Sequence, residues 1–309
     1  MRYVLIGCGV GLGALIGIIG GLFLILFVAS FFNGRVGAPT DYTQSALLVH
    51  PPEPLQKEML LKVVTYNVQA LWVVGRNRPA RMREIARVLT DLDPDIVGFQ
   101  EVFVAKDRAV LIDALKYSRL KYHEYFRSAT VGSGLLVMSA FPIQEHYFHR
   151  YSVSNPWYKV WEGDWWAGKG VCLARIALPD GGMIDFYNTH AQAGYGNPAY
   201  KDLRVIQMAE LAAFINKTRT RTAPALLTGD MNCRPGAVDF ETAVSGAGLT
   251  RAMTIDTSID HIFSVDDPRY VFETIETVTI PTRIQKDGKS FQLSDHPGYL
   301  SQVRIKPRE

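Results

Sequence analysis

Cysteine is scarce in this chain of 309 residues: only three occur, and only Cys172 and Cys233 follow Arg35. Two cysteines cannot form a disulfide framework, and these two do not have the spacing of a zinc site. A basic tract is also missing, because 31 basic and 30 acidic residues follow Arg35. This near-neutral balance excludes the electrostatic footprint of a strong nucleic-acid binder.

Charge is missing altogether from Tyr3 to Phe32. A run of this length is long enough to cross a bilayer as a helix, so we expect residues 1–34 to be a single-pass transmembrane anchor. The alternative is a cleaved signal peptide with the small-residue site Val36-Gly37-Ala38, for which the apolar run is too long. Arg2 and Arg35 flank the run, and their arrangement favours an extracytoplasmic position for the rest of the chain.

Small residues recur within this run at every fourth position, and a second helix could approach closely along such a stripe. We therefore predict that two copies of this helix can associate through Gly9, Gly13, Gly17 and Gly21. Residues 35–58 contain four prolines and no helical period, which predicts a linker. The remaining residues, 59–309, are expected to be one catalytic domain.

Several apolar strands end in polar side chains. Residues 226–230 form a buried strand that ends at Asp230, and Asn232 lies two positions further on, so both side chains can point into one site. Residues 60–67 end similarly at Asn67, and residues 95–101 at Glu101. A carboxylate at a strand end is costly to bury unpaired. Because Mg²⁺ accepts a few hard oxygen ligands together with waters and a phosphate, we predict a magnesium site with Glu101 and Asn67 as ligands.

Two further segments place histidines at strand ends. Residues 169–176 and 185–193 are expected to pair across a Pro-Asp-Gly-Gly turn, which brings Lys169 and His190 to the same end as candidate phosphate ligands. His296 directly follows Asp295, and neighbours on a strand face opposite ways. We therefore expect Asp260, from another strand, to orient His296 and leave Asp295 for metal or water.

Four of the five tryptophans fall between Tyr151 and Gly168. Two interpretations stay open for this stretch, a packed corner of the core and an aromatic patch at a lipid interface. Trp72, beside arginines in a loop, has the same two interpretations.

The polar strand ends, taken in order, resemble the endonuclease/exonuclease/phosphatase superfamily over residues 60–303. The segments that carry the resemblance are Thr65-Tyr66-Asn67-Val68, Gln100-Glu101-Val102, Thr189-His190, Gly229-Asp230-Met231-Asn232, Ile259-Asp260-His261 and Ser294-Asp295-His296. The resemblance implies an α/β fold, a four-layered α/β/β/α sandwich, and Mg²⁺-dependent hydrolysis of phosphate esters. Lys169-Gly170-Val171 and Thr189-His190-Ala191-Gln192-Ala193 are most similar to neutral sphingomyelinases, although His261 stands where the family usually has an aromatic residue.

We therefore expect a phosphodiesterase of phospholipase C type that acts on a phospholipid or sphingolipid in a membrane. His296 would be the general base, held by Asp260, and Asp230 would position or protonate a reacting oxygen. The resemblance implies metal at Glu101 and Asn67, with Asp295 as a further ligand, and phosphate contacts from Asn232, His190 and Lys169. The alternatives are a nuclease or inositol-phosphate phosphatase of the same fold, and a binding protein that has lost activity.

Overall fold

Most strands of the described residues belong to two six-stranded sheets. The computed structural model describes residues 2–33, 41–72 and 75–308, and it describes side chains of the first helix only for residues 15–30. In spatial order, the first sheet contains β11 (Tyr270–Ile280), β14 (Gly298–Pro307), β1 (Met59–Asn67), β2 (Ile96–Gln100), β4 (Leu136–Ser139) and β3 (Tyr122–Tyr125). The second contains β5 (Ile143–Arg150), β6 (Gly170–Ala177), β7 (Met183–His190), β8 (Ala225–Asp230), β10 (Asp260–Val265) and β9 (Leu249–Arg251).

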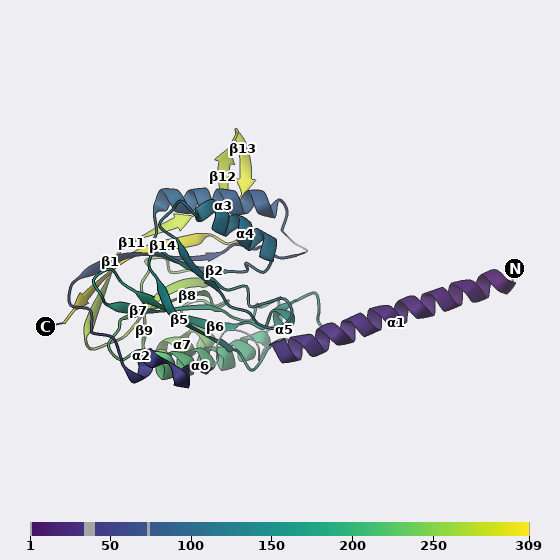
Figure 1. Cartoon of the computed structure of the whole chain (residues 1–309), viewed down its shortest axis with the longest axis horizontal. Coiled ribbons are helices and arrows are strands. Elements are labelled where there is room, and N and C mark those ends of the chain that lie inside the picture. The colour runs from purple at the N-terminus through teal and green to yellow at the C-terminus, as the bar shows by residue number, and fades with distance from the viewer. Residues whose placement is uncertain (1, 34–40, 73–74, 309) are drawn as a thin grey trace.

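Helices cover the outer faces of both sheets (Figure 1). Over the first sheet lie α3 (Arg78–Leu92) and α4 (Ala105–Leu115), and over the second lie α6 (Tyr200–Thr218) and α7 (Val238–Ala247). The hairpin of β12 (Arg283–Lys286) and β13 (Lys289–Gln292) projects beyond α3. Shorter elements are the 3₁₀ turn η1 (Tyr42–Gln44), α2 (Ala46–Val49) and α5 (Asp164–Ala167). The mixed α/β fold is confirmed, and its two sheets with outer helices agree with the expected sandwich.

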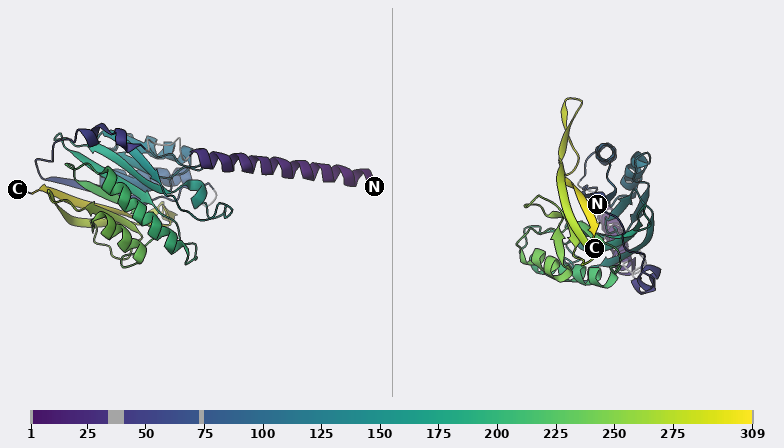
Figure 2. Two further views of the ribbon diagram at one scale, coloured as in Figure 1. Left: turned by 90° about the horizontal axis from the view of Figure 1, so that it is seen from below. Right: turned by 90° about the vertical axis from the view of Figure 1, so that its left-hand side faces the viewer.

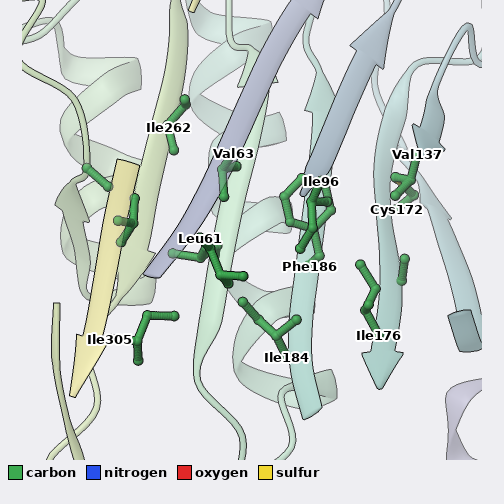
Figure 3. Close-up of a cluster of buried hydrophobic side chains, with 14 of the residues drawn as sticks. Leu61, Val63, Ile96, Val137, Cys172, Ile176, Ile184, Phe186, Ile262 and Ile305 are labelled. Carbon is green, nitrogen blue, oxygen red and sulfur yellow. The ribbon is translucent and has the colours of Figure 1, made fainter. Parts of the chain in front are cut away.

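The main core lies between the two sheets. Leu61 and Ile96 from the first sheet meet Phe186 and Ile262 from the second, and all four are at most 1% exposed (Figure 3). Fully burying such a side chain stabilises the fold by roughly 1.5–3 kcal/mol. A second cluster fills the space below α3 and α4, and a third the space below α6 and α7. The sheets are therefore held face to face, which fixes their edges relative to each other.

Helix α3 shows how the sequence pattern sets one of these layers. Met82, Ile85 and Leu89 are spaced three and four apart, so they share one face, and all three are fully buried. Asp93 ends the helix in a left-handed conformation, and the proline after it cannot continue the helix. The sequence therefore determines both the buried face of this helix and the residue at which it ends.

The first helix, α1 (Arg2–Asn33), projects from the domain with its C-terminal end beside α5 (Figures 1 and 2). Among the described residues, no helix is both long enough and apolar enough to cross a membrane. The prediction of a single-pass membrane protein with an extracytoplasmic domain is therefore wrong. The apolar run has another use at its C-terminal end, where the Phe27 ring stacks on Trp165 with ring centroids 5.3 Å apart.

Other expectations for the amino-terminal region fall partly outside the described residues. The alternative cleavage site Val36-Gly37-Ala38 lies outside the described residues, and the surroundings of Gly9 and Gly13 are also outside what the structure describes. Around Gly17 and Gly21 there is open space, because an added Cβ would meet nothing within 4 Å. Self-association through this stripe stays a prediction.

Candidate functional site

Two parallel strand pairs bring the polar strand ends together. β1 runs parallel to β2 with Asn67 opposite Gln100, and β7 runs parallel to β8 with His190 opposite Asp230. Parallel neighbours end at the same edge of a sheet. Asp260 begins the antiparallel neighbour β10 and lies opposite Asp230. Because the sheets pack face to face, the two edges form one site.

His296 and Asp260 form a hydrogen-bonded pair in this site. The imidazole Nδ1 lies 2.9 Å from Asp260 Oδ2, and the carboxyl group is 2% exposed. Burial opposes protonation of His296, but the bond to Asp260 and the charge of Asp230 outweigh it and raise the pKa of His296. Burial, together with Asp230, also raises the pKa of Asp260. Nδ1 therefore carries the proton towards Asp260, and Nε2 is the nitrogen that can exchange a proton.

A second group of side chains lies beside this pair. The amide Nδ2 of Asn67 donates to Glu101 Oε1 and to Asp230 Oδ2, both at 3.0 Å. Glu101 has a φ of 60°, a left-handed backbone that non-glycine residues rarely adopt. Burial, with the nearby charges of Asp230 and Asp295, raises the pKa of Glu101 to about 7, although Lys169 and Asn67 oppose the change. Negative charge is therefore in excess here.

This group fits a divalent cation. Glu101, His190 and Asp230 each offer a ligand atom within 4.8 Å of the others. The Asn67 amide nitrogen lies between two carboxylates and carries a partial positive charge. It therefore occupies the position that a cation would take. The Asn67 oxygen accepts from the Gln69 backbone N–H at 3.1 Å, and turning the amide over would break that bond and present the oxygen to a cation. Carboxylate and amide oxygens are preferred by hard cations.

Lys169 and His190 lie at the same end, as the register of β6 and β7 requires, with Gly170 opposite His190. The ammonium donates to His190 Nε2 at 2.9 Å and to Ala191 O at 2.8 Å, and it pairs with Asp164 at 2.9 Å. Burial, with the charge of Lys169, lowers the pKa of His190 well below its ordinary value. His190 is therefore neutral, and its buried Nδ1 has no partner among the described residues.

Asn232 faces the same site from the turn after β8. Its backbone N–H donates to Asp230 Oδ1 at 3.0 Å, and its amide donates to Ala191 O at 3.1 Å. The preceding Gly229 is needed for close packing, since a Cβ there would collide with the Thr189 carbonyl. The chain can therefore bring β7 and β8 close at the edge where Asp230 and Asn232 turn inward.

Asp295 lies at the rim of the site. It is exposed, and its Oδ2 accepts a 2.6 Å hydrogen bond from Gln69 Nε2. It does not belong to either group of His and acidic side chains close enough to share an ion among the described residues. Its proposed role as a ligand stays a prediction.

His261 belongs to the core rather than to the site. It is fully buried, bonds Cys233 O through Nε2 at 2.9 Å, and packs against Phe240 with ring centroids 5.1 Å apart. Burial lowers its pKa to about 4. The departure from the family's aromatic residue at this position therefore keeps a ring in an aromatic cluster.

Two features of the site were missed from the sequence. Asp164 holds Lys169 and also accepts from Gln192 Nε2 at 2.7 Å. Below the site, Gln100 donates to Asn188 Oδ1 at 2.7 Å across the two sheets. The available signal for Asp164 was weak, because it is one of two acids, with Glu162, in the tryptophan-rich stretch. The contact between Gln100 and Asn188 had none, because it depends on how the sheets pack.

Comparisons with known proteins identify the family and the fold of this chain. Residues 64–296 match the model of the Endonuclease/Exonuclease/phosphatase family. An inositol phosphosphingolipids phospholipase C of Schizosaccharomyces pombe is 30% identical over 225 residues, which cover 70% of this chain and 53% of that protein. Sphingomyelin phosphodiesterase 2 of Rattus norvegicus is 35% identical over 179 residues, which cover 57% of this chain and 42% of that protein. The chain thus spans between 41% and 61% of the length of the curated relatives that it matches here.

Solved structures share the fold at low sequence identity. Sphingomyelinase C from Streptomyces griseocarneus has a TM-score of 0.63 at 20% identity, covering 79% of this chain and 99% of that one. Beta toxin from Staphylococcus aureus, a structure with bound magnesium ions, has a TM-score of 0.63 at 19% identity, with the same coverage. The family match extends over most of the domain and includes each polar strand end. This chain therefore belongs to the endonuclease/exonuclease/phosphatase family.

Proposed function

We propose that this chain is a Mg²⁺-dependent phosphodiesterase that hydrolyses a sphingolipid or related phospholipid in the manner of a phospholipase C, with catalysis in residues 59–309. The observation that carries the proposal is the His296–Asp260 pair facing the Asn67–Glu101–Asp230 group. The relatives named for sphingomyelin and inositol phosphosphingolipids support a sphingolipid substrate.

His296 acts as the general base. Asp260 holds Nδ1, so Nε2 takes a proton from the attacking water. The water oxygen bonds to phosphorus, and the bond from phosphorus to the lipid's oxygen breaks. That oxygen takes up a proton from solvent water, and His296 releases its own proton to solvent. Asp260 is a positioning residue, because it acts through His296.

The phosphate lies between this base and the metal ligands. Glu101 and Asn67 would hold the cation, with Asp295 reaching it from the rim. A cation held there would neutralise phosphate charge and would stabilise the leaving oxygen. Asn232 and His190 bind non-bridging oxygens, where charge develops, and Asp230 orients a reacting oxygen. Lys169 supports His190 and adds positive charge to this wall.

A screen of the purified chain tests the proposal. It compares sphingomyelin, a glycerophospholipid, inositol phosphates and DNA, each with Mg²⁺ and with excess chelator. We expect release of a water-soluble phosphorylated head group from lipid, only with Mg²⁺. Cleavage of DNA or inositol phosphates without lipid turnover would contradict the proposal and favour another activity of the same fold, and no turnover at all would favour a binding protein.

A further inference from the structure

A cavity of about 420 Å³ adjoins the candidate site. Glu101, Lys169 and His190 line its inner end. Its other walls are mostly apolar and come from several separate segments of the chain. They include Phe23 and Leu26 of α1, Leu71 and Trp72, and Trp161 and Trp166. One end is therefore charged and continuous with the site, and the rest suits hydrocarbon.

The tryptophan-rich stretch divides between the two interpretations that the sequence left open. Trp166 is 9% exposed, whereas Trp161 is 76% exposed. Trp166 donates through Nε1 to Trp157 O at 3.0 Å, which fixes its ring as part of the wall. The stretch is thus a packed corner at its base, and it presents an exposed apolar side chain at the mouth of the cavity.

Helix α1 is seated firmly enough to serve as a wall. The Phe23 ring packs edge-on against Trp166 with ring centroids 5.4 Å apart. The Leu26 carbonyl accepts a 3.0 Å hydrogen bond from Thr130, and the Ser30 carbonyl accepts a 3.1 Å bond from Arg150. The last turns of α1 are therefore attached to the domain by both aromatic and polar contacts.

The position of the cavity relative to the base decides which part of a substrate it takes. Neither His296 nor Asp260 is among the described residues that line it. In a phosphoryl displacement the attacking and leaving oxygens lie in line, on opposite sides of phosphorus. Water activated by His296 attacks from one side, so the cavity at Glu101 and His190 lies towards the leaving oxygen.

We propose that this cavity receives the hydrocarbon chain of the lipid substrate on the leaving-group side of the phosphate, and that α1 forms one of its walls. The inference rests on the proposed function and adds a substrate subsite to it. The alcohol that leaves carries the chains, so its departure follows the apolar wall outward. Shortening a chain that the cavity buries then lowers kcat/KM by roughly 4-fold per methylene.

The test compares Leu26→Gln with Ile25→Gln in the full chain. Both residues lie on the exposed surface of α1, but only Leu26 lines the cavity. Substrates are hexanoyl and dodecanoyl sphingomyelin below their micelle-forming concentrations, and bis(4-nitrophenyl) phosphate, which has no alkyl chain. We expect Leu26→Gln to lower kcat/KM for the dodecanoyl lipid by about 10-fold, the scale of one buried leucine. Leu26→Gln should leave kcat/KM for the soluble diester unchanged, and Ile25→Gln should leave kcat/KM for every substrate unchanged.

A binding measurement separates this inference from the proposed function. Sphingomyelin with a dibrominated acyl chain quenches nearby tryptophans, so quenching reports the chain in the cavity without turnover. We expect quenching in the wild type and in Ile25→Gln, and about 10-fold weaker binding in Leu26→Gln. Trp161→Ala, from a different wall, should weaken binding as well, with Tyr158→Ala in the same stretch as its control.

The outcomes are distinct. In one outcome, Leu26→Gln and Trp161→Ala match the wild type in both lipid hydrolysis and quenching. This result would overturn the subsite and leave the proposed function intact. Equal losses on lipid and on the soluble diester would also overturn it, because they would give α1 a structural role only. Quenching that depends on Leu26 in a chain that hydrolyses no lipid would support the subsite and contradict the proposed function.

Discussion

Two clusters of buried charge involve strands of the second sheet, and they are built in opposite ways. At one cluster, Arg175 is fully buried and pairs with Glu145 at 2.6 Å and with Asp185 at 3.2 Å. At the other, Glu101, Asp230 and Asp260 lie close together, with Lys169 and His296 as charged basic partners and a neutral His190. The first cluster has a cation at its centre, and the second has carboxylates around a space.

The hydrogen bonds of the two clusters differ in the same sense. Arg175 also donates to Ser45 at 2.7 Å and to Thr220 at 3.1 Å, and Ser45 donates to Glu145 at 2.6 Å. In the candidate site, Asp260 Oδ1 and His190 Nδ1 are buried without partners among the described residues. Buried polar atoms are normally paired. The first cluster is therefore complete as a structural unit, and the second is arranged for a ligand.

The pKa values of Glu145 and Asp185 show that burial also affects the charge of the first cluster. Burial opposes ionisation of Glu145, but Ser45 and Arg175 outweigh it and lower the pKa. Asp185 shares the same arginine, yet burial prevails and raises its pKa. The two carboxylates differ because Glu145 is 17% exposed and Asp185 is fully buried. The contrast between the clusters accordingly rests on the central cation rather than on pKa values alone.

Removing the central cation should have the largest effect. Arg175→Met leaves Asp185 buried and unpaired, so we expect the free energy of unfolding to fall by about 3–5 kcal/mol, measured by urea denaturation. The control is Arg87→Met, because Arg87 is 55% exposed and forms surface ion pairs, which contribute about 0–1 kcal/mol. A loss below about 1 kcal/mol in Arg175→Met would show that the first cluster is not a structural unit.

The base pair of the second cluster should affect turnover instead. His296→Gln should lower kcat by about 10²–10⁴-fold, and Asp260→Asn by roughly 10²-fold or more. The two losses should not add in the double variant, because the residues act as one unit. His123→Gln, an exposed histidine, is the control. Additive losses in the double variant would show that Asp260 does not act through His296.

The same pair makes a prediction about protonation. In metal-free protein, His296 should stay protonated at pH values well above about 6.5, its ordinary pKa, because Asp260 and Asp230 favour the charged ring. A bound cation would oppose that charge and leave Nε2 free to act as the base. In Asp260→Asn its pKa should fall, because a neutral amide no longer favours the charged ring. A pH titration of the histidine signals by NMR measures both. Identical titration in the two proteins would mean that Asp260 does not control the charge of His296.

Much of the site was predictable because it follows from local pattern. Apolar strands ending in Asn67, Glu101, His190 and Asp230 were visible in the sequence, and their placement at one edge needed only parallel pairing. The rule that strand neighbours face opposite ways led to Asp260 as the partner of His296, and the structure brings the two within 2.9 Å.

What escaped prediction depends on contacts between distant segments. Arg175 and Ser45 are 130 residues apart and have no shared motif. The wall formed by Phe23 and Leu26 arises only when α1 meets the tryptophan-rich stretch. Composition alone suggested a membrane span for the same apolar run, because hydropathy does not reveal that its last turns contact Trp165 and Trp166. Strands β11 to β13 were also not foreseen, since their exposed surfaces carry little apolar periodicity.

The smallest expected effect concerns Glu101 and tests the contrast between the clusters most closely. Its folded-state pKa of about 7 lies above the ordinary value of 4.5, so the folded state keeps a proton that the unfolded state loses. Stability of the metal-free chain is therefore lost as pH rises from about 4.5 to about 7. Glu101→Gln removes this loss and should be more stable than the wild type by about 1–3 kcal/mol at neutral pH.

The most direct measurement follows one preparation of Glu101→Gln in two assays, with Glu53→Gln, an exposed acid, as control. One assay is the free energy of unfolding in excess chelator, and the other is sphingomyelin turnover with Mg²⁺. The account predicts that Glu101→Gln gains stability and loses most turnover, while Glu53→Gln changes neither. A Glu101→Gln protein that is less stable without metal, or fully active with it, would contradict the claim that this cluster is built for a cation.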